Sequence, residues 1–255
     1  MWLGEELRRE AFFFDSGGQQ LYGSLYAAAS PSVSVGVAIC NSWGFEGNQS
    51  DGTMHRIALG AAHAGGAGLV FHYPGFGDSH GDLAEATIDA LVGAAVDAAG
   101  EGSRRLPGTR WVFAGLMFGA SVAALAAPRA DVDRLLLVQP TLQPSDYFTR
   151  LERSARRAAA RVPARAGNAY GYPLPHRILE NRAAVDATVA EALAGFGGAG
   201  AIVRYAQPAA DPVSERLEEI VLPGAWRFGA RQKPELAQAS CDWLRSVAAE
   251  EQGET

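Results

Sequence analysis

Apolar and polar residues alternate in two short segments near the start of the chain, and continuous apolar runs follow them. Residues 11–15 and 20–27 alternate and are joined by Ser16-Gly17-Gly18, which predicts an antiparallel hairpin. Residues 35–40 form an apolar run, as expected of a strand buried on both faces. The rest of the pattern predicts strands at residues 68–73, 111–114, 134–138, 201–205 and 218–222, and helices at residues 52–64, 83–99, 119–127 and 234–249. Strands that alternate with helices indicate a parallel sheet with helices on both faces.

The alternation is interrupted once. It stops after Pro140 and resumes at Ala201, and between them lie an arginine- and alanine-rich helix pattern and the proline-containing segment 171–175. A chain of 255 residues that is 48% hydrophobic is long enough to bury one sizeable core with such an insertion. We therefore expect an α/β core with an inserted helical cap, the core formed by residues 1–140 and 197–255 and the cap by residues 141–196.

One turn bounded by glycines has the outline of a catalytic motif. An apolar strand pattern leads into Gly115-Leu116-Met117-Phe118-Gly119, and a helix pattern of small residues leads out of it. This is the strand, sharp turn and helix of the G-x-S-x-G nucleophile elbow, whose glycines prevent collisions with the neighbouring strand and helix. The centre holds Met117 where Ser or Cys is expected. A thioether has no proton to lose and forms no acyl intermediate, so the turn lacks its reactive atom.

The order of elements, with an elbow after the third parallel strand, resembles the α/β-hydrolase superfamily. Residues 72–81 are similar to the D-x-R-G-x-G-x-S-x-G loop of lipases, esterases and peptidases, and residues 41–46 stand where that family donates an N–H to the oxyanion hole. The elbow and the Gly-Tyr-Pro-Leu of residues 171–174 resemble most closely the hydrolase-like proteins associated with exosortase systems. The resemblance implies an α/β fold with a mostly parallel twisted sheet, an N-terminal antiparallel hairpin and an inserted helical cap.

The resemblance also implies where the other two triad members belong. The acid follows the penultimate strand, where Asp211 is the candidate, and the histidine belongs in the loop after the last strand. That loop carries Trp226 and Arg227 instead, and all five histidines precede it. A guanidinium stays charged at any working pH and cannot shuttle a proton as imidazole does. The chain is therefore expected to lack the Ser and the His of the triad.

Four other residues are candidates for these lost roles. Ser121 is a displaced nucleophile only if the strand extends four residues further, and otherwise it packs a helix on the sheet. Cys40 needs a nearby base to act as a nucleophile, and is otherwise a buried structural cysteine. His72 and His80 are candidate bases, although His72 also suits hydrogen bonding at a strand end. Asp211, without a histidine, equally suits a helix cap.

The oxyanion hole is made of backbone and does not depend on the missing side chains. Its expected donors are the N–H of Phe118 and one N–H of the Ser42-Trp43 turn. Two alternatives remain open: either Met117 fills the space, as methionine does in irregular gaps, or an apolar pocket is present. In that pocket Arg227 would hold an anion, and the lining would be Met117, Phe118, Trp43, Phe76 and Trp226.

Charge and composition exclude several classes of function. The formal net charge of −6 argues against binding to nucleic acid, and the arginine cluster of residues 150–165 is interpreted as a solvated helix face. The N-terminus has no signal-peptide pattern and no apolar run approaches a membrane span, so we expect a cytoplasmic protein with no membrane partner. Cys40 and Cys241 are too few for a disulfide framework, and no spacing suggests a metal or a cofactor.

These patterns favour a non-hydrolytic protein that binds an apolar, carbonyl-bearing small molecule, such as an acyl or biosynthetic intermediate. One alternative is an enzyme for a step without a nucleophile, such as cyclisation, isomerisation or lyase chemistry, in which His72, His80 or Asp211 moves a proton. Another is a scaffold that binds a protein partner. Fold alone cannot rank these functions.

Overall fold

The computed structural model describes residues 7–29, 33–205, 216–223 and 234–253. Its main sheet has eight strands: β1 (Leu7–Ser16), β2 (Gln19–Ala28), β3 (Val35–Cys40), β4 (Ala67–Phe71), β5 (Arg110–Leu116), β6 (Arg134–Val138), β9 (Ala199–Tyr205) and β10 (Leu217–Leu222). The spatial order is β1-β2-β4-β3-β5-β6-β9-β10. β2 pairs antiparallel with β1 and β4, and all pairs from β4 to β10 are parallel. The predicted hairpin and parallel sheet are confirmed.

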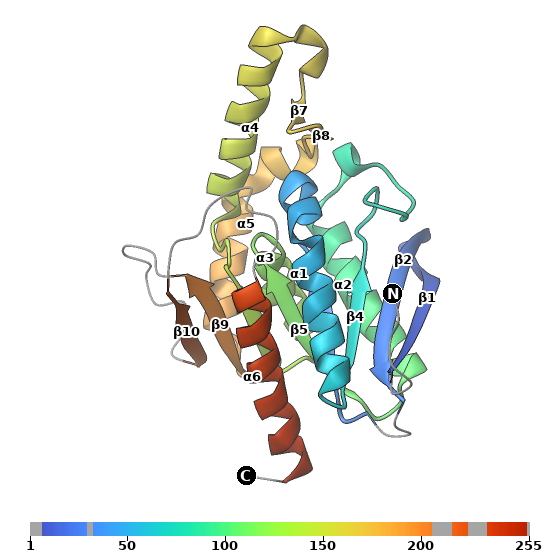
Figure 1. The fold of residues 1–255 in the computed structure, drawn as a ribbon. Coiled ribbons are helices and arrows are strands. Elements are labelled where there is room, and N and C mark those ends of the chain that lie inside the picture. Colours follow the sequence, from blue (N-terminus) through green and yellow to red (C-terminus); the bar gives the residue numbers. More distant parts are fainter. Residues whose placement is uncertain (1–6, 30–32, 206–215, 224–233, 254–255) are drawn as a thin grey trace.

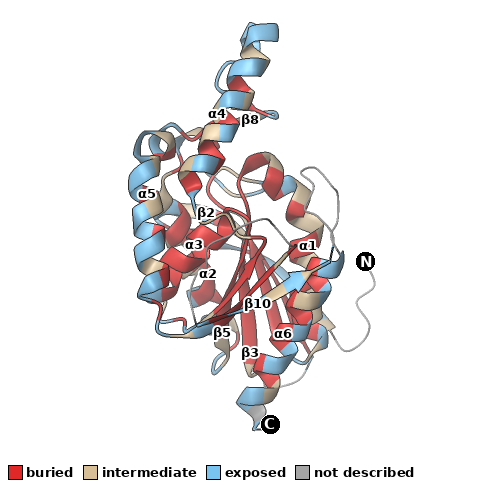
Figure 2. Ribbon diagram, turned by 90° about the vertical axis from the view of Figure 1, so that its left-hand side faces the viewer, coloured by how far each residue is buried: buried red, intermediate tan, exposed pale blue. Residues whose placement is uncertain are grey.

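Helices cover both faces of the sheet. One face carries α1 (Gly44–His63) and α6 (Pro234–Gln252), and the other carries α2 (Ile88–Arg105), α3 (Gly119–Ala126) and α5 (His176–Ala194), as Figure 2 shows. Two apolar clusters fill the spaces between the sheet and these helix layers. All six residues of β3 are buried, as its apolar run predicts. No helix in the described parts of the chain is long and apolar enough to cross a membrane.

The first helix begins earlier than the sequence predicts. α1 starts at Gly44, whereas the pattern predicts a helix from residue 52. The side chain of Asn41 holds the added turns, because its Nδ2 donates to the carbonyl oxygen of Gly47 (3.0 Å) and its Oδ1 accepts from the hydroxyl of Ser50 (2.7 Å). Glycines have low helix propensity, so this glycine-rich start has a weak local signal.

The helix predicted at residues 83–99 is divided in two. A short 3-10 turn, η1 (Leu83–Glu85), precedes α2, which begins at Ile88. Each part has its own N-cap: the Asp82 side chain accepts from the N–H of Ala84, and the Thr87 side chain accepts from the N–H of Ala90. Because each N-cap marks the start of a helical segment, two N-caps five residues apart indicate two separate helical segments.

The inserted segment between β6 and β9 has an outer and an inner part. The outer part consists of α4 (Pro144–Arg161), η3 (Pro163–Arg165) and a ribbon of β7 (Asn168–Ala169) and β8 (Tyr172–Pro173), and Figure 1 shows α4 rising away from the sheet. The inner part is α5, which packs against α3 and α4. The boundaries between core and cap at residues 141 and 196 stay a prediction. Of the residues assigned to the cap, those of α5 lie in the helix layer that covers the sheet.

Backbones approach one another closely at the turn between β5 and α3. A Cβ atom on Gly119 would overlap the carbonyl oxygens of Cys40 and Asn41, and one on Gly115 would overlap the Cα of Ala120. Met117, between these glycines, has φ of 50°, in the left-handed region that L-residues rarely adopt. The elbow geometry predicted from the two glycines is therefore present, with methionine at its centre.

Replacing Gly119 with alanine should destabilise the protein strongly. The added methyl group meets backbone on β3 that cannot rotate away, so we expect Gly119→Ala to lower the free energy of unfolding by about 3 kcal/mol or more. The matched control is Gly93→Ala on α2, where nothing lies within 4 Å of the new Cβ and helix propensity should add about 0.5–1 kcal/mol. Urea unfolding measures both, and equal midpoints would contradict the close approach.

Candidate functional site

Met117 lies at the centre of the turn between β5 and α3, where the elbow pattern of the sequence predicts the reactive residue. Its backbone is fully engaged: the N–H donates to the carbonyl oxygen of Val138 (2.9 Å), and its own carbonyl accepts from the N–H groups of Ala120 (3.1 Å) and Thr141 (3.0 Å). Its side chain is only 6% exposed. The elbow is thus held by strand and helix packing, and its central side chain is a buried thioether.

Neither of the other two candidate nucleophiles replaces it. Ser121 lies within α3, past the elbow, where it is 1% exposed and its hydroxyl donates to the carbonyl oxygen of Thr141 (2.6 Å). Cys40 ends β3 and is fully buried, and burial raises the pKa of its thiol to about 12. A thiol that keeps its proton is a poor nucleophile. The packing interpretation holds for both residues.

The loop after β3 retains one of its expected oxyanion donors. The N–H of Ser42 donates to its neighbour's side chain, Asn41 Oδ1 (2.8 Å), so it is not available to a ligand. Among the described residues, no acceptor takes the N–H of Trp43 or that of Phe118. The predicted hole therefore reduces to the Trp43 and Phe118 donors.

Tyr147, which the sequence analysis did not select, ties α4 to this loop. Its ring stacks on that of Phe118, with centroids 5.6 Å apart and planes 6° from parallel, and its hydroxyl donates to the carbonyl oxygen of Trp43 (3.1 Å). Burial raises the pKa of Tyr147 well above its ordinary value, so it remains a neutral donor. Phe118, in this stack, and Trp43, both predicted to line a pocket, are almost completely buried.

Glu46 is a buried carboxyl group in the first turn of α1, and it too was missed from the sequence. It is 9% exposed and accepts a hydrogen bond from the hydroxyl of Ser42 (3.2 Å). Burial raises its pKa from 4.5 to about 7, while the Ser42 hydroxyl, the positive charge of Arg150 and the Tyr147 hydroxyl oppose that rise. A carboxyl group poised near neutral pH beside a candidate site can hold or release a proton there.

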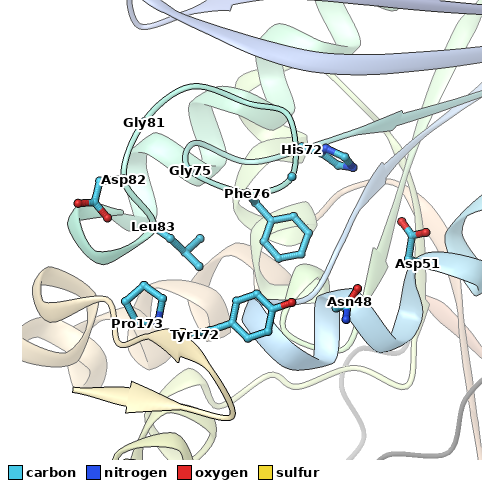
Figure 3. Close-up of a pocket in the computed structure, with 11 residues that line it drawn as sticks. Asn48, Asp51, His72, Gly75, Phe76, Gly81, Asp82, Leu83, Tyr172 and Pro173 are labelled. Carbon is cyan, nitrogen blue, oxygen red and sulfur yellow. The ribbon is translucent and has the colours of Figure 1, made fainter. Parts of the chain in front are cut away.

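An open pocket of about 610 Å³ lies on the other side of the start of α1. We call it the aromatic pocket, because the rings of Phe76 and Tyr172 stack along its wall with centroids 6.2 Å apart. Figure 3 shows the His72 ring and the Asp51 carboxylate at one end and Leu83 at the other. Of the predicted site residues, His72 and Phe76 meet here; the full lining is Asn48, Asp51, His72, Gly75, Phe76, Gly77, Gly81, Asp82, Leu83, Tyr172 and Pro173.

His72 is held in one orientation at the end of β4. Its Nδ1 accepts from the backbone N–H of Asp78 (3.3 Å), and its ring lies 5.1 Å from that of Tyr22. Burial lowers the pKa of His72, an effect that the carboxylates of Asp51 and Asp78 oppose. A neutral imidazole that accepts at Nδ1 carries its proton on Nε2. His72 therefore presents a hydrogen-bond donor.

His80, the second candidate base, has an exposed side chain outside this lining. Its backbone joins the turn to the hairpin, since its N–H donates to the carbonyl oxygen of Gln20 (2.9 Å). The remaining predicted site residues, Asp211, Trp226 and Arg227, lie outside the described residues. Within the described part of the chain, no group of three or more His, Cys, Asp or Glu side chains is placed to hold a metal ion.

The buried Glu46 makes stability depend on pH. The folded protein keeps the Glu46 proton up to about pH 7, but the unfolded chain loses it near 4.5, so the free energy of unfolding should fall as the pH rises between these values. The expected loss is on the order of 3 kcal/mol. Urea unfolding at several pH values should show this slope in the wild type and its loss in Glu46→Gln. The exposed Glu180→Gln on α5 is the control, and an unchanged slope in Glu46→Gln would contradict the assignment.

Comparison with known proteins identifies the fold. No protein-family model matches the chain, and no curated protein sequence matches it. Its structure is similar to Est1E from Butyrivibrio proteoclasticus with ferulic acid bound (TM-score 0.67, 16% identity, covering 95% of this chain and 100% of that one). It is also similar to an alpha-beta serine hydrolase homologue from Coxiella burnetii (TM-score 0.59, 16% identity, covering 94% of this chain and 96% of that one). A further similar structure is the thioesterase domain from the curacin biosynthetic pathway (TM-score 0.54, 14% identity, covering 96% of this chain and 99% of that one). The chain therefore has the α/β-hydrolase fold.

Proposed function

We propose that this protein binds an apolar, carbonyl-bearing small molecule and does not hydrolyse it through an acyl intermediate. The observation that carries the proposal is Met117 at the centre of a fully formed elbow. The thioether is inert as a nucleophile, Cys40 keeps its proton, and the Ser121 hydroxyl is engaged with the backbone. The elbow thus has the shape of a hydrolase site without a described group that can form the covalent intermediate.

The aromatic pocket supports a ligand of this kind. Its volume of about 610 Å³ is within the range of small-molecule sites, and the stacked rings of Phe76 and Tyr172 provide an apolar wall. His72 Nε2 provides a neutral hydrogen-bond donor, which suits the carbonyl oxygen of an ester, thioester or amide. Asp51 and Asp82 also line the pocket, so a neutral carbonyl compound fits better than a carboxylate.

The structural neighbours are consistent with carbonyl ligands. The Est1E structure has ferulic acid bound, and the curacin neighbour is a thioesterase domain. Both are properties of those proteins, and at 16% and 14% identity they support only the choice of a first probe. An ester of ferulic acid, such as ethyl ferulate, combines an aromatic ring for the pocket wall with a neutral carbonyl group for His72.

A second candidate function is an enzyme for a step that needs no nucleophile. It is favoured by one specific observation, the position of the Asp51 carboxylate and the His72 imidazole at the same end of the pocket (Figure 3). A neutral imidazole donor polarises a carbonyl group, and a carboxylate accepts a proton from the neighbouring carbon. Isomerisation would follow from that arrangement for a bound carbonyl compound with an acidic proton on that carbon, which a ferulate ester lacks. Conversion of a β,γ-unsaturated ester such as ethyl 4-phenylbut-3-enoate would distinguish this function from binding alone.

Ethyl ferulate should bind to the wild type and be recovered unchanged. Fluorescence titration measures binding, and chromatography after incubation measures ferulate or any other product. We expect His72→Gln and Phe76→Ala each to weaken binding about tenfold, the loss expected for one hydrogen bond or one ring contact in a pocket. His63→Gln, an exposed histidine at the end of α1, is the control and should leave the Kd unchanged.

Two results would overturn this proposal. Release of ferulate above background that disappears in Ser121→Ala or Cys40→Ala would restore a hydrolase with a displaced nucleophile. The proposed class of ligand would be excluded if neither ethyl ferulate nor any member of a panel of neutral aromatic esters and thioesters bound to the protein. Isomerisation of ethyl 4-phenylbut-3-enoate to the conjugated ester, seen with the wild type but not with Asp51→Asn, would replace binding by the enzymatic alternative.

A further inference from the structure

Positive charge is concentrated in one short segment of an acidic protein. Residues 150–165 contain six arginines and one glutamate, whereas the whole chain has a formal net charge of −6. This segment forms the outer part of α4 and the η3 turn, at the end of the molecule farthest from the C-terminus of the chain (Figure 1). The expected solvated face is confirmed, since all six of these arginines are exposed.

Three of these arginines line a groove rather than a convex helix surface. Arg157 and Arg161 are one helical turn apart on α4, and Arg165 follows them in η3. The opposite wall is the ribbon, which contributes Asn168 and Tyr170, and the enclosed volume is about 890 Å³. We call this the arginine groove. Side chains three and four positions apart share one face of a helix, so the first two guanidinium groups can converge on one ligand.

The charges in the groove are not neutralised within the described part of the chain. Arg157, Arg161 and Arg165 make no ion pair there, while Glu152, the one carboxylate of the segment, pairs with Arg156 (3.3 Å) and Arg182 (3.2 Å). Like charges held together repel one another, and an anion between them removes that repulsion. Guanidinium groups bind phosphate oxygens through two parallel N–H donors, which a lysine cannot do.

The groove also has apolar walls. Val162 is 43% exposed and Tyr170 is 50% exposed, and both are among its lining residues. The Tyr170 ring is held in place, because it stacks on Phe45 with centroids 5.2 Å apart. A wall fixed in this way is preformed, which lowers the entropic cost of binding a flat or apolar group.

We propose that the arginine groove is a binding site for a phosphate-bearing group attached to an apolar or aromatic moiety. The guanidinium groups of Arg157 and Arg161 contact the phosphate oxygens, Arg165 adds a third positive charge, and Tyr170 with Val162 contacts the apolar part. The site is separate from the aromatic pocket, to which the same ribbon contributes Tyr172, and it does not depend on the function proposed above.

Calorimetric titration with 1-naphthyl phosphate tests the proposal on the full chain. The double variant Arg157→Gln/Arg161→Gln should weaken binding at least about tenfold, and raised salt should weaken binding to the wild type. The matched control is Arg104→Gln/Arg129→Gln, which removes the same charge from exposed arginines on α2 and on the 3-10 turn η2 (Ala127–Arg129). Circular dichroism melting of all three proteins checks that each is folded.

Further arms distinguish the source of the phosphate. Flotation with phosphatidic acid vesicles, and with phosphatidylcholine vesicles as the blank, tests a lipid headgroup. Binding of 1-naphthyl phosphate alone supports a soluble ligand, and flotation that is lost in the groove variant supports a lipid. Naphthyl phosphate and vesicles that both fail to bind would overturn the proposal. So would binding that the groove variant and the control weaken equally, since that is the effect of overall charge.

Discussion

The contact on which the site depends is the approach of the elbow backbone to the end of β3. Gly119 lies against the carbonyl oxygens of Cys40 and Asn41, closer than any side chain permits, and Gly115 lies equally close to the first turn of α3. Between these two glycines the chain turns sharply, and Met117 has φ of 50° there. The strain of that conformation, about 1–3 kcal/mol, is supported by the surrounding packing. The shape of the elbow therefore follows from the packing of α3 on the sheet and does not depend on which side chain is at its centre.

Two groups of side chains lie on opposite sides of the loop after β3 and the start of α1. On the inner side, Ser42, Glu46 and Tyr147 form a buried polar cluster under α4, with the ring of Phe118 stacked on Tyr147. On the outer side, Asn48 and Asp51, which belong to α1 as Glu46 does, face the aromatic pocket. A shift in the start of α1 would move both groups together, because Asn41 fixes that start through its hydrogen bonds to Gly47 and Ser50. Backbone contacts of the elbow thus position side chains that do not touch it.

The sequence predicts this architecture where local patterns dominate and fails where distant segments decide. The hairpin, β3 and the elbow follow from alternation, apolar runs and paired glycines, and all are present. The early start of α1 could not be predicted, because it rests on the side chain of Asn41 rather than on helix propensity. The buried state of Glu46 could not be predicted either, because Tyr147 and Arg150 of α4, which face it, are about a hundred residues away in the sequence. Likewise, the tautomer of His72 depends on the backbone of Asp78.

The inserted segment is where this chain departs from a bare sheet and its helices. Its ribbon contributes Tyr172 to the aromatic pocket and Tyr170 to the arginine groove, two residues separated by a single glycine. Residues two apart in an extended strand point to the same side, but Tyr170 has φ of 53° and Gly171 has φ of 91°, so the tight turn allows the two rings to face different pockets. One pocket is lined by carboxylates and a neutral imidazole, and the other by guanidinium groups that form no ion pair within the described part of the chain. One short ribbon therefore contributes to two pockets of opposite charge, while the turn beneath them has Met117 at its centre.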